Sequence, residues 1–171
     1  MWGKPSNAVY VQSMQLVRER TAHPKVAHVW AELIPNVFHR VFLRRMQMGC
    51  IPNLKVNTSK WGSSSDPATV RREVECTCAH GGVQDAHHFF FNCAHTEHLR
   101  QACLLAAKRA VDSFGNDASR VSWEQRTDKE KLQWGLSPAV KGPWRMEAAM
   151  KQAFAQIWVV GATNVCDGLA F

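Results

Sequence analysis

The expected fold is decided by residues 76–93, which read Cys76-Thr77-Cys78-Ala79-His80-Gly81-Gly82-Val83-Gln84-Asp85-Ala86-His87-His88-Phe89-Phe90-Phe91-Asn92-Cys93. This stretch contains three of the six cysteines and three of the eight histidines of the chain. Cysteine and histidine ligands a few residues apart can converge on one zinc ion at about 2.0 to 2.3 Å. We therefore predict a tetrahedral zinc site formed by Cys76, Cys78, His88 and Cys93.

The residues between these ligands fit a metal-binding knuckle followed by a short regular segment. Gly81 and Gly82 allow a tight turn with positive φ at little steric cost. Residues 86–92 are expected to start a helix or a short strand that carries His88 inward, and the three phenylalanines after it are expected to shield the metal from water. The choice between His87 and His88 as the ligand stays open. The competing interpretation makes the cysteines buried apolar residues and the histidines surface residues.

Length and charge narrow the class of protein. The chain has 171 residues, which is enough for one domain or one and a half. Its net charge of +7 predicts a basic surface. Such a charge favours an anionic partner, nucleic acid before acidic lipid. The basic residues expected to contact phosphate, unless they form a solvated face, flank the knuckle on its N-terminal side: Arg40, Arg44, Arg45, Lys55, Lys60, Arg71 and Arg72.

The cysteines and the first residues indicate the compartment. Six cysteines could form three disulfides in a secreted protein, but residues 1–7 lack the apolar core of a signal peptide. We therefore expect a reducing, intracellular setting with metal-bound thiolates. Glu19 is the first carboxylate, which favours the mitochondrion over the nucleus. Residues 153–171 are apolar but interrupted by polar residues, so we predict a buried strip against a partner rather than a membrane span.

Hydrophobic spacing predicts a mainly α protein, a small helical domain with a zinc knuckle and irregular connecting loops. We divide it into an N-terminal helical arm (1–35), a basic helix with the knuckle (36–115) and a C-terminal helical extension (116–171). A short helix or an irregular packed arm is expected at 8–20, and a second helix from 25 to about 33. Asn36 should cap a third helix whose apolar stripe includes Val37, Phe38 and Val41.

Two further helices are expected after the knuckle. The first begins at His95 or Thr96 and ends at Gly115 and Asn116, with Arg100, Lys108 and Arg109 outside and this core face: Leu99, Ala102, Cys103, Ala106 and Ala110. Residues 122–132 are charged and short, and residues 134–143 are expected to form an irregular connection. The last helix starts near Pro143, a favoured first-turn residue, and its apolar positions are Met146, Met150, Phe154, Ile157 and Trp158.

Two motifs resemble the zinc-binding tail of non-LTR, LINE-like retrotransposon reverse transcriptases. Cys76-Thr77-Cys78 with His88-Phe89-Phe90-Phe91-Asn92-Cys93 is similar to their Cys-x-Cys-Gly, His-x-Leu-x-x-Cys pattern, although Ala79 replaces the usual Gly. Leu43-Arg44-Arg45-Met46-Gln47-Met48-Gly49-Cys50-Ile51-Pro52-Asn53 resembles the Arg-x-Arg-x-Gly-x-x-Pro segment that precedes it. The resemblance covers roughly residues 37 to 112 and implies the same four metal ligands.

The resemblance implies a binding module without its enzyme. The chain has no Tyr-x-Asp-Asp polymerase motif and no carboxylate set suited to a two-metal ribonuclease H site. We expect a non-catalytic, zinc-stabilised subunit of a larger protein complex that is RNA-associated or structural, for example in the mitochondrial ribosome. The alternative is a free-standing DNA- or RNA-binding zinc protein.

A zinc hydrolase or deaminase is the third candidate. His95-Thr96-Glu97 gives a His-x-Glu element, but the Pro-Cys-x-x-Cys that should follow is missing. Four protein ligands would also close the metal to water. We therefore expect neither catalysis nor a small-molecule substrate.

Overall fold

The structure is a computed structural model and describes residues 34–41, 68, 74–137 and 140–162. The protein is mainly helical, as predicted, with a cysteine and histidine cluster at one end of the helices. Its elements are the π-helix η1 (His88–Asn92), the 3-10 helix η2 (Ala94–Thr96) and the α-helices α6 (Glu97–Phe114), α7 (Asp117–Glu124), α8 (Asp128–Leu136) and α9 (Trp144–Ala162). Residues 37–41 are also helical. Strand pairing within the described residues is a single bridge between Glu75 and Val83.

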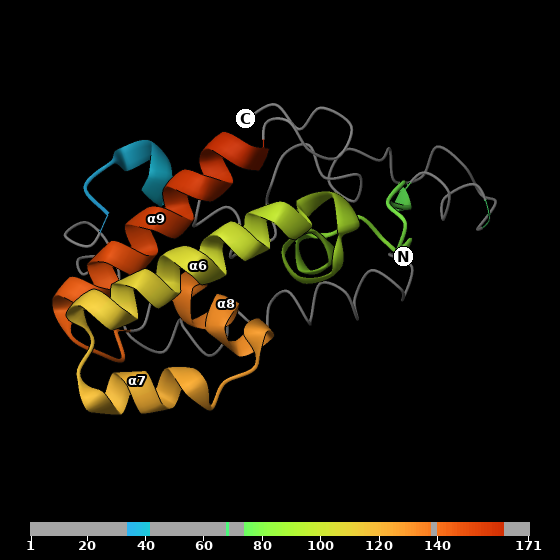
Figure 1. The fold of residues 1–171 in the computed structure, drawn as a ribbon. Helices are drawn as coiled ribbons and strands as arrows, with labels where there is room; N and C mark the ends of the chain where they lie inside the picture. Colours follow the sequence, from blue (N-terminus) through green and yellow to red (C-terminus); the bar gives the residue numbers. More distant parts are fainter. Residues whose placement is uncertain (1–33, 42–67, 69–73, 138–139, 163–171) are drawn as a thin grey trace, which may run out of the picture.

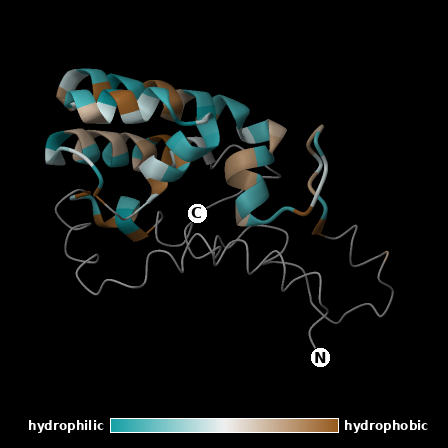
Figure 2. Ribbon diagram, turned by 90° about the horizontal axis from the view of Figure 1, so that it is seen from below, coloured by the Kyte–Doolittle hydropathy of each residue, from teal (hydrophilic) through white to brown (hydrophobic). Residues whose placement is uncertain are grey.

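Helices α6 and α9 lie side by side in opposite directions and form the centre of the fold (Figure 1). Helix α8 packs against both, and α7 contacts α6. The core face of α9 repeats every four residues and is fully buried at Met146, Met150, Phe154 and Trp158. Hydrophilic and hydrophobic residues alternate along the helices (Figure 2). The predicted last helix is thus confirmed.

Aromatic rings join the knuckle to α9 in one hydrophobic core. The rings of Phe89 and Phe90 are buried, with centroids 5.5 and 4.8 Å from that of Trp158. Phe91 is only partly buried. Phe89 and Phe90 therefore dock η1 onto α9 and share one buried cluster with the ligand cysteines, while Phe91 packs at its edge.

Helix α9 also buries an ion pair. Lys151 Nζ lies 3.0 Å from Glu147 Oε2, and both side chains are fully buried. Lys151 Nζ also donates to the carbonyl oxygens of Trp134 (3.1 Å) and Ser137 (2.6 Å). Glu147 Oε1 accepts from Trp134 Nε1 at 2.8 Å and from the backbone N–H of Lys141 at 2.9 Å. The pair thereby binds α9 to α8 and to the chain that follows α8.

Helix α6 differs from its prediction in which residues face the core. Gly115 follows its last residue, and Lys108 and Arg109 are exposed, as expected. Arg100 was expected outside but is buried, because its guanidinium pairs with Glu97 and donates to Thr96 Oγ1. The buried side chains of this helix are Leu99, Arg100, Cys103, Ala107, Ala110 and Val111, so Ala102 and Ala106 lie at the edge of the core.

Two helices occupy the stretch that was expected to be short or irregular. Asn116 caps α7 by accepting from the backbone N–H of Ser119 at 2.8 Å. Thr127 and Glu130 form a reciprocal capping box at the start of α8. Trp134 and Gly135 lie inside α8, which corrects the predicted connection at 134–143.

The first described residues confirm one prediction and correct another. Asn36 Oδ1 accepts from the backbone N–H groups of Phe38 and His39, as a helix cap does. Val37, Phe38 and Val41, which were expected to be buried, are exposed, and Ile34 is buried instead. The helix or packed arm predicted at 8–20 and the helix predicted at 25–33 lie outside the described residues. Among the helices described, none combines the length and apolarity that crossing a membrane requires.

Candidate metal centre

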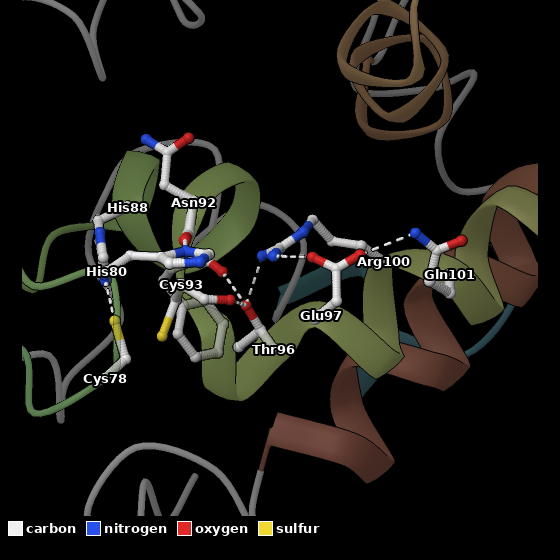
Figure 3. Close-up of polar contacts among 10 residues, drawn as sticks. Cys78, His80, His88, Asn92, Cys93, Thr96, Glu97, Arg100 and Gln101 are labelled. Carbon is white, nitrogen blue, oxygen red and sulfur yellow. Dashed lines mark hydrogen bonds and ion pairs between the residues drawn. The ribbon is translucent and has the colours of Figure 1, made fainter.

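Four buried side chains converge at the end of the helical pair. The ligand atoms of Cys76, Cys78, His88 and Cys93 all lie within 4.8 Å of one another. The Sγ atoms of Cys76 and Cys93 are 3.7 Å apart, and Cys78 Sγ is 3.3 Å from His88 Nε2 (Figure 3). In a tetrahedral zinc site with bonds of about 2.3 Å, two sulfurs are separated by about 3.8 Å, whereas a disulfide needs about 2.05 Å. These two distances are close to those of a four-coordinate metal site, and the whole cluster is compact enough to hold one ion.

The knuckle places Cys76 and Cys78 by backbone hydrogen bonds. The N–H of Cys76 donates to Gly82 O at 2.7 Å, and the N–H of Gly81 donates to Cys78 O at 2.9 Å. Gly81 and Gly82 have φ of 61° and 93°, the predicted positive values. The chain therefore reverses direction after Cys78, before it reaches the third ligand, His88.

The π-helix η1 places His88 and Cys93. The N–H of Cys93 donates to His88 O at 2.7 Å, which is the i to i+5 bond of a π-helix. In an α-helix, residues five apart would point about 140° away from each other. The wider turn instead lets both side chains reach one cluster. Asp85 Oδ1 accepts from the N–H of His88 at 2.6 Å and caps the segment.

The choice between the two histidines is decided by geometry. His88 belongs to the cluster, whereas the ring of His87 packs against Phe91, with centroids 5.2 Å apart. His87 Nδ1 lies 3.4 Å from the side-chain nitrogen of Asn92. Of these two histidines, only His88 therefore offers a nitrogen to the three sulfurs.

The surroundings shift the pKa of three of the four ligands. Burial raises the pKa of Cys76 to about 11. Burial also acts on Cys78, but the backbone N–H groups of Ala94 and His80 favour its thiolate and lower its pKa overall. A hydrogen bond with Cys93 raises the pKa of His88. Three buried thiolates repel one another, so a positive ion is needed to hold them together in the ionised form.

The wider comparison gives no relative. No protein-family model matches the chain, and no curated protein or solved structure matches it.

Several polar residues that support the cluster were not found from the sequence. Buried Gln84 donates to Cys76 Sγ at 3.8 Å. Thr96 Oγ1 donates to Phe89 O at 2.6 Å and accepts from Arg100 Nη1, which ties η1 to α6. Asp85, three residues before His88, matches the helix-cap spacing and could have been found from it.

The proposed phosphate-binding residues fall mainly outside the described part. Arg40 is described, and its Nη1 donates to the carbonyl oxygens of Ile34 (3.0 Å) and Pro35 (3.1 Å). The other six lie outside the described residues: Arg44, Arg45, Lys55, Lys60, Arg71 and Arg72. The described residues carry eleven of the 21 Lys and Arg and nine of the 14 Asp and Glu. They are therefore almost neutral, and the basic excess belongs to the rest of the chain.

The His95-Thr96-Glu97 element takes another role. Thr96 is fully buried, and its hydroxyl group is hydrogen-bonded. Glu97 pairs with Arg100 and accepts from Gln101 (Figure 3). Neither His95 nor Glu97 belongs to the metal cluster found among the described residues. The His95-Thr96-Glu97 segment forms the N-terminal end of α6 instead.

Proposed function

We propose that this chain is a non-catalytic, zinc-stabilised protein that acts as an RNA-associated or structural subunit of a larger protein complex. The observation that carries the proposal is the convergence of four buried protein ligand atoms within 4.8 Å of one another. Four protein ligands complete the coordination of zinc and leave no position for a reacting water. Three cysteines and one histidine are a soft donor set, which favours zinc over magnesium or calcium.

In this proposal zinc stabilises the fold at its least supported part. Within the described residues, the knuckle has one β-bridge and a few turn hydrogen bonds, whereas α6 and α9 share an extensive apolar interface. Zinc at structural sites of this kind contributes on the order of 10 kcal/mol to folding. Its role here is to fasten the knuckle to η1 and α6.

The RNA partner is supported by net charge and by the retroelement resemblance. The basic residues on the N-terminal side of the knuckle would contact phosphate, which positions a protein without reading sequence. Because zinc fixes Cys76 and Cys78, it also fixes the point from which that basic segment departs. A mitochondrial ribosome is one assembly that offers both RNA and protein surfaces to such a subunit.

The metal centre is tested by measuring the zinc content of purified protein and by replacing zinc with Co²⁺, whose thiolate bands report sulfur ligation. We expect one zinc per chain, and strongly weakened binding in Cys78→Ser and His88→Ala. His87→Ala is the matched control, since it removes the neighbouring histidine and should leave the stoichiometry unchanged. Protein that takes up no metal when reduced, or that loses it in His87→Ala but not in His88→Ala, would contradict the proposal.

The partner is tested separately by the salt dependence of RNA binding. Binding to naked RNA through several phosphates should fall steeply with salt, with a slope of about 0.7 per phosphate on single strands. Such a slope supports direct RNA contact and, if no protein partner copurifies, a free-standing RNA- or DNA-binding protein. Copurification with a defined protein assembly supports the embedded subunit.

A further inference from the structure

Beside the metal cluster lies a mixed aromatic and basic surface that the metal site does not use. It is formed by His80 of the knuckle, by His87, Phe91 and Asn92 around η1, and by Lys129 at the start of α8. His80, Asn92 and Lys129 are exposed, and His87 and Phe91 are partly exposed. We refer to these five residues as the knuckle face.

Contacts between these residues hold the knuckle face together. The centroid of the Phe91 ring lies 5.2 Å from that of His87, and Lys129 Nζ lies 5.7 Å from it on the face of the ring. His80 Nδ1 is 2.7 Å from the carbonyl oxygen of Asn92. The surface therefore joins three separate segments of the chain: His87 and Lys129 meet at the Phe91 ring, and His80 contacts the backbone of Asn92.

The π-helix explains why Phe91 points outward. The same five residues must place His88 in the cluster and Phe89 and Phe90 against Trp158, which leaves the third phenylalanine at the surface. A partly exposed phenylalanine costs free energy because apolar surface stays in water. π-helical turns occur frequently at functional sites. Both facts favour a binding role for Phe91.

We propose that the knuckle face binds an unpaired nucleobase of single-stranded RNA, which stacks on Phe91 and His87 while Lys129 contacts the adjoining phosphate. Stacking on an aromatic ring accepts any base, because every base has a π-face. Asn92 and His80 supply side-chain groups that can hydrogen-bond a base edge. This inference rests on the proposed RNA association and names the place where single strands would be distinguished from duplex.

The acidic groups beside the knuckle face are already engaged, including the two that flank Lys129: Asp128 pairs with Lys131, and Glu130 accepts from Thr127. Asp85 accepts from the N–H of His88, and Glu97 pairs with Arg100 and accepts from Gln101. They therefore oppose an approaching phosphate less than free carboxylates would. The charge on Lys129 is left facing the ring of Phe91.

The test measures fluorescence anisotropy of a labelled single-stranded RNA 12-mer, and of a duplex of the same length, with the zinc-loaded full chain. Phe91→Leu keeps an apolar side chain and removes the aromatic ring. Base stacking is worth about 1 to 3 kcal/mol, so we expect about 5- to 150-fold weaker single-strand binding, an unchanged salt slope and little change on duplex. Phe91→Trp should restore the affinity. Lys129→Gln should reduce the salt slope by about 0.7, the value of one phosphate on a single strand.

The control is Phe114→Leu, which changes an exposed phenylalanine at the opposite end of α6 and should leave RNA binding unchanged. Circular dichroism and zinc content must match the wild type in every variant compared. If the wild type binds single strands and Phe91→Leu binds equally well, the knuckle face is not the site, although RNA association stands. If the wild-type chain binds neither RNA, both this inference and direct RNA contact are wrong.

Discussion

The buried ion pair of α9 gives a sharp test of the packing. Glu147→Gln keeps the size of the side chain and an oxygen for Trp134 Nε1 and the Lys141 N–H, but it removes the negative charge. Lys151 would then keep a buried ammonium with the carbonyl oxygens of Trp134 and Ser137 as partners. Removing one partner of a buried pair costs about 3 to 5 kcal/mol. We expect a midpoint of thermal unfolding that is lower by about 6 to 20 °C.

The assay is thermal and urea unfolding of four proteins, the wild type, Glu147→Gln, Lys151→Met and the double variant. Because each single change strands a charge that the double change removes, the double variant should be less destabilised than the sum of the singles. The control is Lys108→Met, which breaks an exposed pair of the same spacing with Asp112 and should have little effect, since water screens it. Single variants that cost under about 1 kcal/mol, with additive effects, would refute the reasoning.

Two further predictions concern α8. Gly135→Ala should lower the free energy of unfolding by about 1 to 3 kcal/mol, because the new Cβ would lie 2.2 Å from the buried ring of Phe154. In a helix with free space at this position, the same change would raise stability. Urea unfolding measures the difference, and a stabilised variant would contradict the packing. Hydrogen bonds from Thr127 lower the pKa of Glu130, so their contribution is present above the ordinary glutamate pKa and is lost as the pH falls through the lowered value. Thr127→Ala should therefore make stability fall less between neutral and acid pH, as followed by thermal unfolding at several pH values; an unchanged pH profile would count against the capping box.

The sequence was most informative where chemistry and geometry limit the choices. The four ligand positions, the glycine turn, the Asn36 cap and the period of α9 were all predicted, because each depends on residue types with narrow conformational or chemical uses. Arg100 was predicted to be exposed because it is charged. Helical periodicity does not show that a neighbour such as Glu97 will pair with a charged side chain and allow its burial. The burial of Lys151 was not predicted for the same reason, since it depends on the pairing with Glu147.

Helices α7 and α8 differ from the prediction because their ends are marked more clearly than their apolar faces. The capping patterns at Asn116 and at Thr127 with Glu130 are visible in the sequence, but short helices with few apolar residues give a weak periodic signal. The exposure of Val37 and Phe38 could not be foreseen, because a hydrophobic stripe predicts a face that needs a partner but does not identify that partner.

The wide turn at His88–Asn92 makes the fold sensitive to chain length in a way that side-chain substitution cannot reveal. Loss of one residue there would let the backbone relax to ordinary α geometry and would turn everything that follows by about 100°. Cys93 would swing out of the cluster and α6 would leave its direction along α9. This short segment should therefore accept exchanges of residue type far more readily than insertions or deletions.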